Sequence, residues 1–160
     1  MQLRLLPLFL VLGLTACSSC VSSNSALKAH SHAAETLDDL ANDAKETVLE
    51  LRQRALDDAV ARATSEGLRG PELDALVTQA AGDFDKGPAV SSVNAFIHAK
   101  DLYVRAVLAS ASKDKPTWDT VKPMLRDVIA AYNAMRDALG RPDKMPAIPD
   151  AISQLIGGSS

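Results

Sequence analysis

The spacing of apolar residues predicts a chain that is helical over most of its length. From residue 33 to residue 66, apolar side chains recur every three or four positions, as they do on one face of an α-helix. The same period covers residues 71–84, 89–112 and 117–139. In residues 71–84 the apolar stripe consists of Leu73, Leu76, Val77, Ala80 and Phe84. In residues 89–112, with Tyr103 at the edge of the stripe, it consists of Val93, Phe96, Ile97, Val104, Val107, Leu108 and Ala111. The clearest stripe, in the last of these segments, consists of Trp118, Val121, Leu125, Val128, Tyr132, Met135 and Leu139.

Glycine and proline residues predict where these helices begin and end. Gly67 follows the first segment, Pro71 suits the first position of the second helix, Gly87 closes the second and Gly140 closes the fourth. Pro123 interrupts the fourth stripe. It is tolerated if it lies in the first turn of a helix that begins near residue 120, and a kink is the alternative.

Amphipathic helices joined by short turns have to bury their stripes against one another. The predicted fold class is therefore all-α, an antiparallel bundle of about four helices over residues 33–156. The first helix is longer than the others, so part of it is expected to project. A short amphipathic turn is expected at residues 151–156 after an irregular strap, and residues 157–160 are expected to be a disordered tail.

The N-terminal residues 1–16 have the features of a signal peptide. Arg4 precedes an apolar run from Leu5 to Leu14 that is broken only by Pro7 and Gly13. A run of about ten residues is too short for a membrane-spanning helix, which needs roughly 20, but it fits the apolar region of a secretory signal.

The next residues resemble a membrane-anchoring motif. Leu14-Thr15-Ala16-Cys17 resembles the lipobox of bacterial lipoproteins, in which an aliphatic residue and two small residues precede a cysteine. The resemblance implies cleavage between Ala16 and Cys17, a diacylglyceryl group on the Cys17 thiol and, in many Gram-negative hosts, a third acyl chain such as palmitate on its amine. Several acyl chains on one residue give stable attachment to a membrane. An ordinary secretory signal followed by an unrelated cysteine is the alternative.

The residues after Cys17 bear on location and flexibility. Ser18 stands where enterobacterial lipoproteins retained in the inner membrane have Asp, which favours the outer membrane, facing the periplasm. Residues 17–32 are rich in Ser, Ala and Asn without an obvious apolar period, and are expected to form a flexible tether. Cys20 is interpreted as a spare thiol, with a second acylation site or an intermolecular disulfide as alternatives.

Composition narrows the possible partners. The chain has 160 residues, of which 47% are hydrophobic and only 4% aromatic, a composition that suits closely packed helices. Its net charge is -3, and removal of residues 1–16 takes away Arg4 and leaves 16 basic against 20 acidic residues. No cluster of Lys and Arg is present, so nucleic acid is not an expected partner.

Few residues suggest chemistry. His30 and His32 could bind a transition metal weakly, but solvated histidines in a tether are the preferred interpretation. His98 lies off the apolar face of its helix. Trp118 could anchor a partner, but its place at the start of the stripe favours core packing. Lys100 falls within an apolar arc and is expected to pack its stem while its ammonium reaches outward.

No pattern predicts catalysis, a cofactor or a metal site. The chain has no Glu-x-x-His pair, no Gly-rich phosphate loop and no G-x-S-x-G motif. The acidic pairs Asp38-Asp39 and Asp57-Asp58 diverge on a helix, and Asp83 and Asp85 are too few for a calcium loop. All of them are expected on solvated faces.

The sequence thus favours a lipid-anchored bacterial envelope protein that is not an enzyme and has a binding or structural role. Its expected partners are the membrane, through acylated Cys17, and an envelope protein whose identity the sequence does not give. Two alternatives stay open. One is a periplasmic carrier of a small hydrophobic ligand or metal, because a helical bundle can enclose a pocket. The other is a lipoprotein encoded by a phage or prophage that acts on the host envelope.

Overall fold

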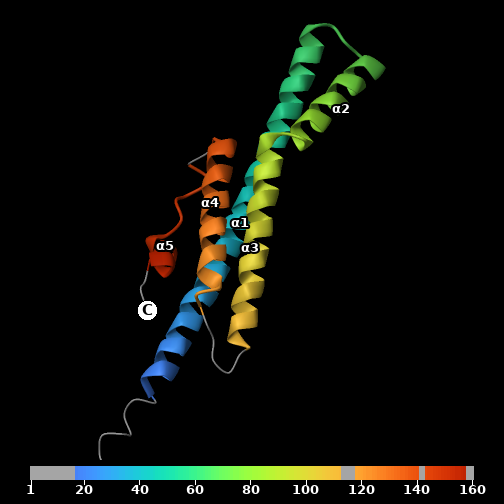
Figure 1. The fold of residues 1–160 in the computed structure, drawn as a ribbon. Helices are drawn as coiled ribbons and strands as arrows, with labels where there is room; N and C mark the ends of the chain where they lie inside the picture. Colours follow the sequence, from blue (N-terminus) through green and yellow to red (C-terminus); the bar gives the residue numbers. More distant parts are fainter. Residues whose placement is uncertain (1–16, 113–117, 141–142, 158–160) are drawn as a thin grey trace, which may run out of the picture.

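The described part of the chain is a set of five helices. The computed structural model describes residues 17–112, 118–140 and 143–157, and none of these lies in a β-strand. The helices are α1 (Cys17–Ser65), α2 (Pro71–Asp85), α3 (Pro88–Ala111), α4 (Val121–Leu139) and α5 (Asp150–Gly157) (Figure 1). The predicted all-α class and helical bundle are confirmed.

The longest helix, α1, belongs to two parts of the molecule. It has 49 residues and is therefore about 74 Å long at 1.5 Å per residue. Its N-terminal half packs against the α3–α4 hairpin, whereas its C-terminal end runs beyond the bundle beside α2 (Figure 1). We call this projecting hairpin, residues 53–85, the arm. The expectation that part of the first helix projects is confirmed.

The predicted flexible tether at residues 17–32 is wrong for the backbone that the structure describes, because α1 begins at Cys17. The bundle also begins before residue 33, since His30 is only 3% exposed. His30, Ala33, Leu37 and Leu40 follow one another at spacings of three and four, so His30 extends the buried stripe of the helix by one turn.

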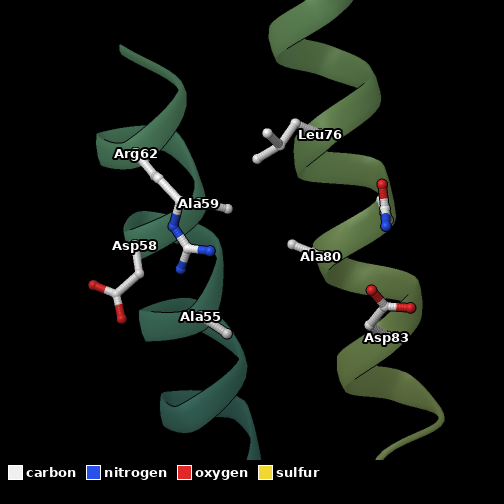
Figure 2. A pocket seen from close by; sticks show the side chains of 8 residues that line it. Ala55, Asp58, Ala59, Arg62, Leu76, Ala80 and Asp83 are labelled. Carbon is white, nitrogen blue, oxygen red and sulfur yellow. The ribbon is translucent and has the colours of Figure 1, made fainter. Parts of the chain in front are cut away.

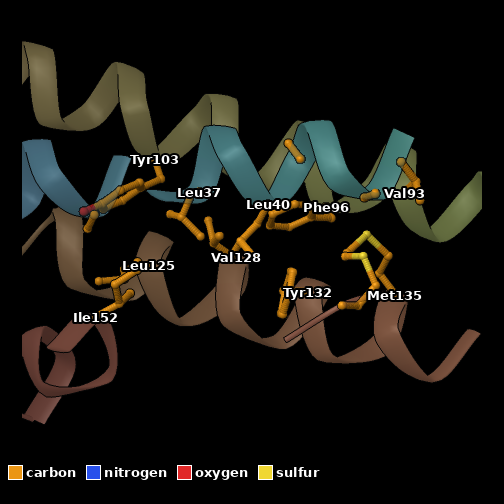
Figure 3. Packing of buried hydrophobic residues seen from close by; sticks show 14 of the residues in the cluster. Leu37, Leu40, Val93, Phe96, Tyr103, Leu125, Val128, Tyr132, Met135 and Ile152 are labelled. Atoms are coloured by element: carbon orange, nitrogen blue, oxygen red, sulfur yellow. The ribbon is translucent and has the colours of Figure 1, made fainter. Parts of the chain in front are cut away.

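The core lies between α1, α3 and α4 (Figure 3). Its centre is an edge-to-face pair, with the rings of Phe96 and Tyr132 5.2 Å apart. The aliphatic side chains of Leu37 and Leu125 are fully buried close to this pair. From Val121 onward, the predicted stripe of the fourth helix is confirmed, since its members are buried: Val121, Leu125, Val128, Tyr132, Met135 and Leu139.

The apolar face of α3 matches the expected stripe at Val93, Phe96 and Val107, which are buried, but differs from it at two positions. Tyr103, expected at the edge of the stripe, is fully buried, while Leu108, expected within it, is 65% exposed. The buried positions are spaced by three, seven, four and three residues and consist of Val93, Phe96, Tyr103, Val107 and Ser110. That heptad-like register faces α1 and α4, and Leu108 lies outside it.

Glycine and proline set the helix boundaries as predicted. After α1, Gly67 has φ of 78°, its N–H donates to the Thr64 carbonyl, and the N–H of Leu68 donates to the Ala63 carbonyl. This double hydrogen bond is a Schellman motif. Gly140 has φ of 59° and ends α4. Because α4 begins at Val121, Pro123 lies in its first turn, where proline removes no helical hydrogen bond.

The described residues 143–149 of the strap between α4 and α5 are held against α4 by packing and hydrogen bonds. Met145 is fully buried, and its backbone carbonyl accepts a hydrogen bond from Arg136 Nε at 2.7 Å. The Tyr132 hydroxyl donates to the Pro146 carbonyl at 2.6 Å. These contacts lead the chain to α5, where Ile152 is buried.

The burial pattern of α1 predicts unequal costs for two identical substitutions. Leu37→Ala removes a fully buried side chain, and we expect it to lower the free energy of unfolding by about 2–5 kcal/mol. Leu49→Ala, on the same helix, removes a side chain that is 65% exposed, and we expect a change within about 0.5 kcal/mol. Urea unfolding followed by circular dichroism measures both, and equal losses would contradict the register of α1.

Candidate functional site

The predicted lipidation site lies at the edge of the described chain. Ala16 is outside the described residues, and Cys17 is the first residue of α1. Cleavage between Ala16 and Cys17 and acylation of Cys17 stay predictions.

The arm exposes apolar surface that the bundle does not cover. None of the residues of α2 is buried. Its apolar stripe is only half-buried against α1 and consists of Leu73, Leu76, Val77, Ala80 and Phe84. On the α1 side of the arm, Ala59 and Ala63 are buried, but Val60 is exposed. Two helices cannot enclose a core between them, so apolar side chains of the arm stay partly exposed to solvent.

An open groove of about 450 Å³ runs between the two helices of the arm (Figure 2). Small and apolar side chains line its middle: Ala55, Ala59, Leu76 and Ala80. Charged and polar side chains also line the groove, with Asp58 and Arg62 on α1 and Gln79 and Asp83 on α2.

The charges that line the groove are available to a ligand or partner. Within the described residues, the side chains of Asp58, Arg62 and Asp83 take part in no hydrogen bond or ion pair. Both signs of charge are present, so the groove suits a partner surface that itself carries mixed charges.

An ion pair fastens the base of the arm. Arg52 Nε lies 2.9 Å from Asp85 Oδ1, and Nη2 donates to Oδ2 at 3.3 Å. The hydrogen bond from Arg52 lowers the pKa of Asp85 and raises the pKa of Arg52 itself. Both side chains are well exposed, so the pair orients the two helices rather than adding much stability.

A second group of polar side chains lies at the other end of the bundle. We call His30, Tyr103 and Trp118 the His30 cluster. His30 Nδ1 lies 2.9 Å from the Tyr103 hydroxyl, and the imidazole stacks on the Trp118 indole with centroids 4.8 Å apart and an interplanar angle of 16°. Burial lowers the pKa of His30, and the positive charge of Lys122 lowers it further. Burial also raises the pKa of Tyr103.

The interpretation of the H-x-H residues as solvated histidines is wrong for His30 and right for His32. His30 is buried because it occupies a core position of α1. The side chain of His32 is 78% exposed and lies 3.8 Å from Glu35, one turn further along the same helix. The two rings therefore face different surroundings and are not a joint ligand pair.

The expectation that Trp118 packs with the core is confirmed, because it is partly buried against the hydrophobic cluster. Its Nε1 is buried and has no hydrogen-bond partner. Sequence reasoning singled out both Trp118 and His30 but did not predict that the two rings stack.

The remaining candidates are structural or exposed. The Lys100 side chain is 12% exposed, and its ammonium pairs with Asp38 on α1 and with Asp101 at 3.3 Å. Burial lowers the pKa of Lys100, but the two hydrogen bonds outweigh it and the net pKa is raised. The expected packing of its stem is thus confirmed. His98 is exposed, as expected.

The acidic pairs Asp38-Asp39 and Asp57-Asp58 lie on exposed positions, as do Asp83 and Asp85. Among the described residues, no three His, Cys, Asp or Glu side chains are grouped so that they could hold a metal ion.

Comparisons with known proteins supply no family. No protein-family model, curated protein or solved structure matches the chain. Within the described residues, no helix combines the length and the apolar character that crossing a membrane requires.

The open faces of the arm predict uneven stability. We expect the backbone amides of α2 to exchange with solvent faster than those of α3 and α4, because α2 buries no residue whereas the other two helices flank the core. Hydrogen exchange followed by mass spectrometry measures this difference. Equal protection of α2 and α4 would show that the arm is covered in solution.

Proposed function

We propose that the chain is a lipid-anchored protein of the bacterial envelope with a non-enzymatic binding or structural role. The observation that carries this proposal is the tetrapeptide Leu14-Thr15-Ala16-Cys17 after a signal-peptide-like segment. Cleavage before Cys17 leaves the thiol to carry a diacylglyceryl group, and several acyl chains together hold a protein stably on a membrane. Ser18 in the next position favours the outer membrane, with the body in the periplasm.

The continuity of α1 supports a role in reaching a component away from the membrane. The helix begins at Cys17, and the groove of the arm begins at Ala55. At 1.5 Å per residue, about 57 Å of helix separates these two residues. If α1 points away from the membrane, an acylated Cys17 would place the groove up to about this distance from the lipid surface, where an envelope protein can reach it.

The surface of the arm supports binding rather than catalysis. Asp58, Arg62 and Asp83 surround a groove whose middle is lined by alanines and Leu76, and this surface resembles a protein contact more than a substrate pocket. The proposal includes no catalytic residue, cofactor or metal, and no nucleic acid, because the body has more acidic than basic residues.

The anchor is tested by one substitution. In the parent chain, we expect mass spectrometry to find a mature N-terminus at Cys17 that carries acyl groups, and the protein to fractionate with the outer membrane. Cys17→Ser removes the thiol, so we expect no acyl adduct and loss of the protein from the membrane fraction. Cys20→Ser is the matched control and should behave as the parent does.

If Cys17→Ser stays in the membrane fraction and the parent has no acyl adduct, the proposed anchoring is wrong. An adduct on Cys20 instead of Cys17 would move the anchor to that residue.

The binding role of the arm is tested by site-specific photo-crosslinking in the envelope. With a photoreactive amino acid in place of Gln79, which borders the groove, we expect a discrete adduct. The same amino acid in place of Asn133, an exposed position on α4, is the control and should give none. Adducts of equal yield at both positions, or none at Gln79, would count against the arm as the binding surface.

A further inference from the structure

His30 is the point at which three segments meet near the N-terminal end of the bundle. It lies on α1, its ring contacts Tyr103 on α3, and it stacks on Trp118, just before α4. The ring is also almost completely removed from water. A change in the charge of this one side chain therefore acts on the contact between α1 and the α3–α4 hairpin.

The surroundings suit a neutral imidazole. With the ring proton on Nε2, the Tyr103 hydroxyl donates to Nδ1 at 2.9 Å. The Tyr103 hydroxyl also lies 3.4 Å from the His30 carbonyl, so a proton on Nδ1 would turn the hydroxyl towards this longer and weaker contact.

The charged group that faces His30 from the α4 side is the Lys122 ammonium, which repels an imidazolium. Asp119, which lies 3.6 Å from Lys122, is itself exposed. From α3, the facing titratable group is the Tyr103 phenol, which burial keeps neutral. No carboxylate among the described residues forms an ion pair with His30. Two contacts attract the protonated ring: the face of Trp118, and the Tyr103 oxygen, which can accept a hydrogen bond from a protonated Nδ1.

We propose that His30 is a protonation-controlled latch. As a neutral ring it holds the N-terminal end of the bundle segment of α1 against Tyr103 and Trp118, and as an imidazolium it releases this contact. The latch acts at the end of the bundle that is nearer to Cys17. It does not depend on acylation of that residue.

The direction of the pH effect follows from linkage. The undocked ring has the ordinary pKa of 6.5, and the docked ring has a lower pKa. Above pH 6.5 both states are neutral and the latch has its full stability. As the pH falls below 6.5, the undocked state binds the proton first. The docking equilibrium then falls by up to about tenfold per pH unit, until the lowered pKa of the docked ring is reached.

The composition of the chain allows a pH titration to report on this one cluster. Trp118 is the only tryptophan, and His30 is one of three histidines. We expect titration of the full chain in detergent, from about pH 7.5 to about pH 5, to change the emission of Trp118. We also expect it to speed hydrogen exchange in α1 around residues 24–40. Nuclear magnetic resonance of the histidine rings should give His30 a pKa below 6.5.

Matched variants assign the effect to one ring. His30→Gln should remove the pH dependence of Trp118 emission between pH 7.5 and pH 5, whereas His32→Gln and His98→Gln, at the two exposed histidines, should keep it. Lys122→Met removes the repelling charge and should raise the pKa of His30.

Two outcomes would overturn the proposal. One is a His30 pKa of 6.5 or higher in the parent chain, which would mean that attraction to the Trp118 face outweighs burial and Lys122. The other is an acid-induced change that persists in His30→Gln. If that variant does not fold, the pKa of His30 in the parent still decides the matter. The Cys17→Ser chain should respond as the parent does, which separates this result from the test of the anchor.

Discussion

The structure depends on one stripe of side chains along α1, spaced by three and four residues. Over its first half the stripe is buried by α3 and α4, with Leu37 and Ala44 fully covered. Over its last turns the same stripe faces only α2, through Ala59 and Ala63. Because one uninterrupted helix supplies both contacts, the bundle and the arm keep a fixed direction relative to each other along that helix.

Much of the fold could be predicted because its signals are local. Gly67 and Gly140 end helices through left-handed backbone conformations that glycine adopts without strain, and Pro123 fits the first turn of α4. The α4 stripe has the strongest periodicity and matches the observed burial. Burial was predicted wrongly where residue type alone did not decide it. His30 and Tyr103 occupy core positions through their ring faces, whereas Leu108 is apolar but faces outward.

The open groove of the arm could not be predicted from the sequence. Periodicity shows which face of a helix is apolar, but not how completely other elements cover it. Leu76 and Ala80 were expected in a stripe like any other, and only the packing shows that α2 has one partner over most of its length. The sequence also does not predict that Asp58 and Arg62 lie beside a groove, because the groove forms only when α1 and α2 pack together.

The two candidate functional regions, the His30 cluster and the groove of the arm, lie at opposite ends of the molecule. Because they are separated, each can act without the other. The His30 cluster involves buried rings whose state depends on a proton, so it responds to the medium without a partner. The groove has unpaired charges and half-buried apolar side chains, so it can bind the surface of a partner. The Schellman turn at Gly67 and the Arg52–Asp85 pair involve none of the residues of the His30 cluster. Acid should therefore alter how the body is held at its Cys17 end while the shape of the arm is preserved.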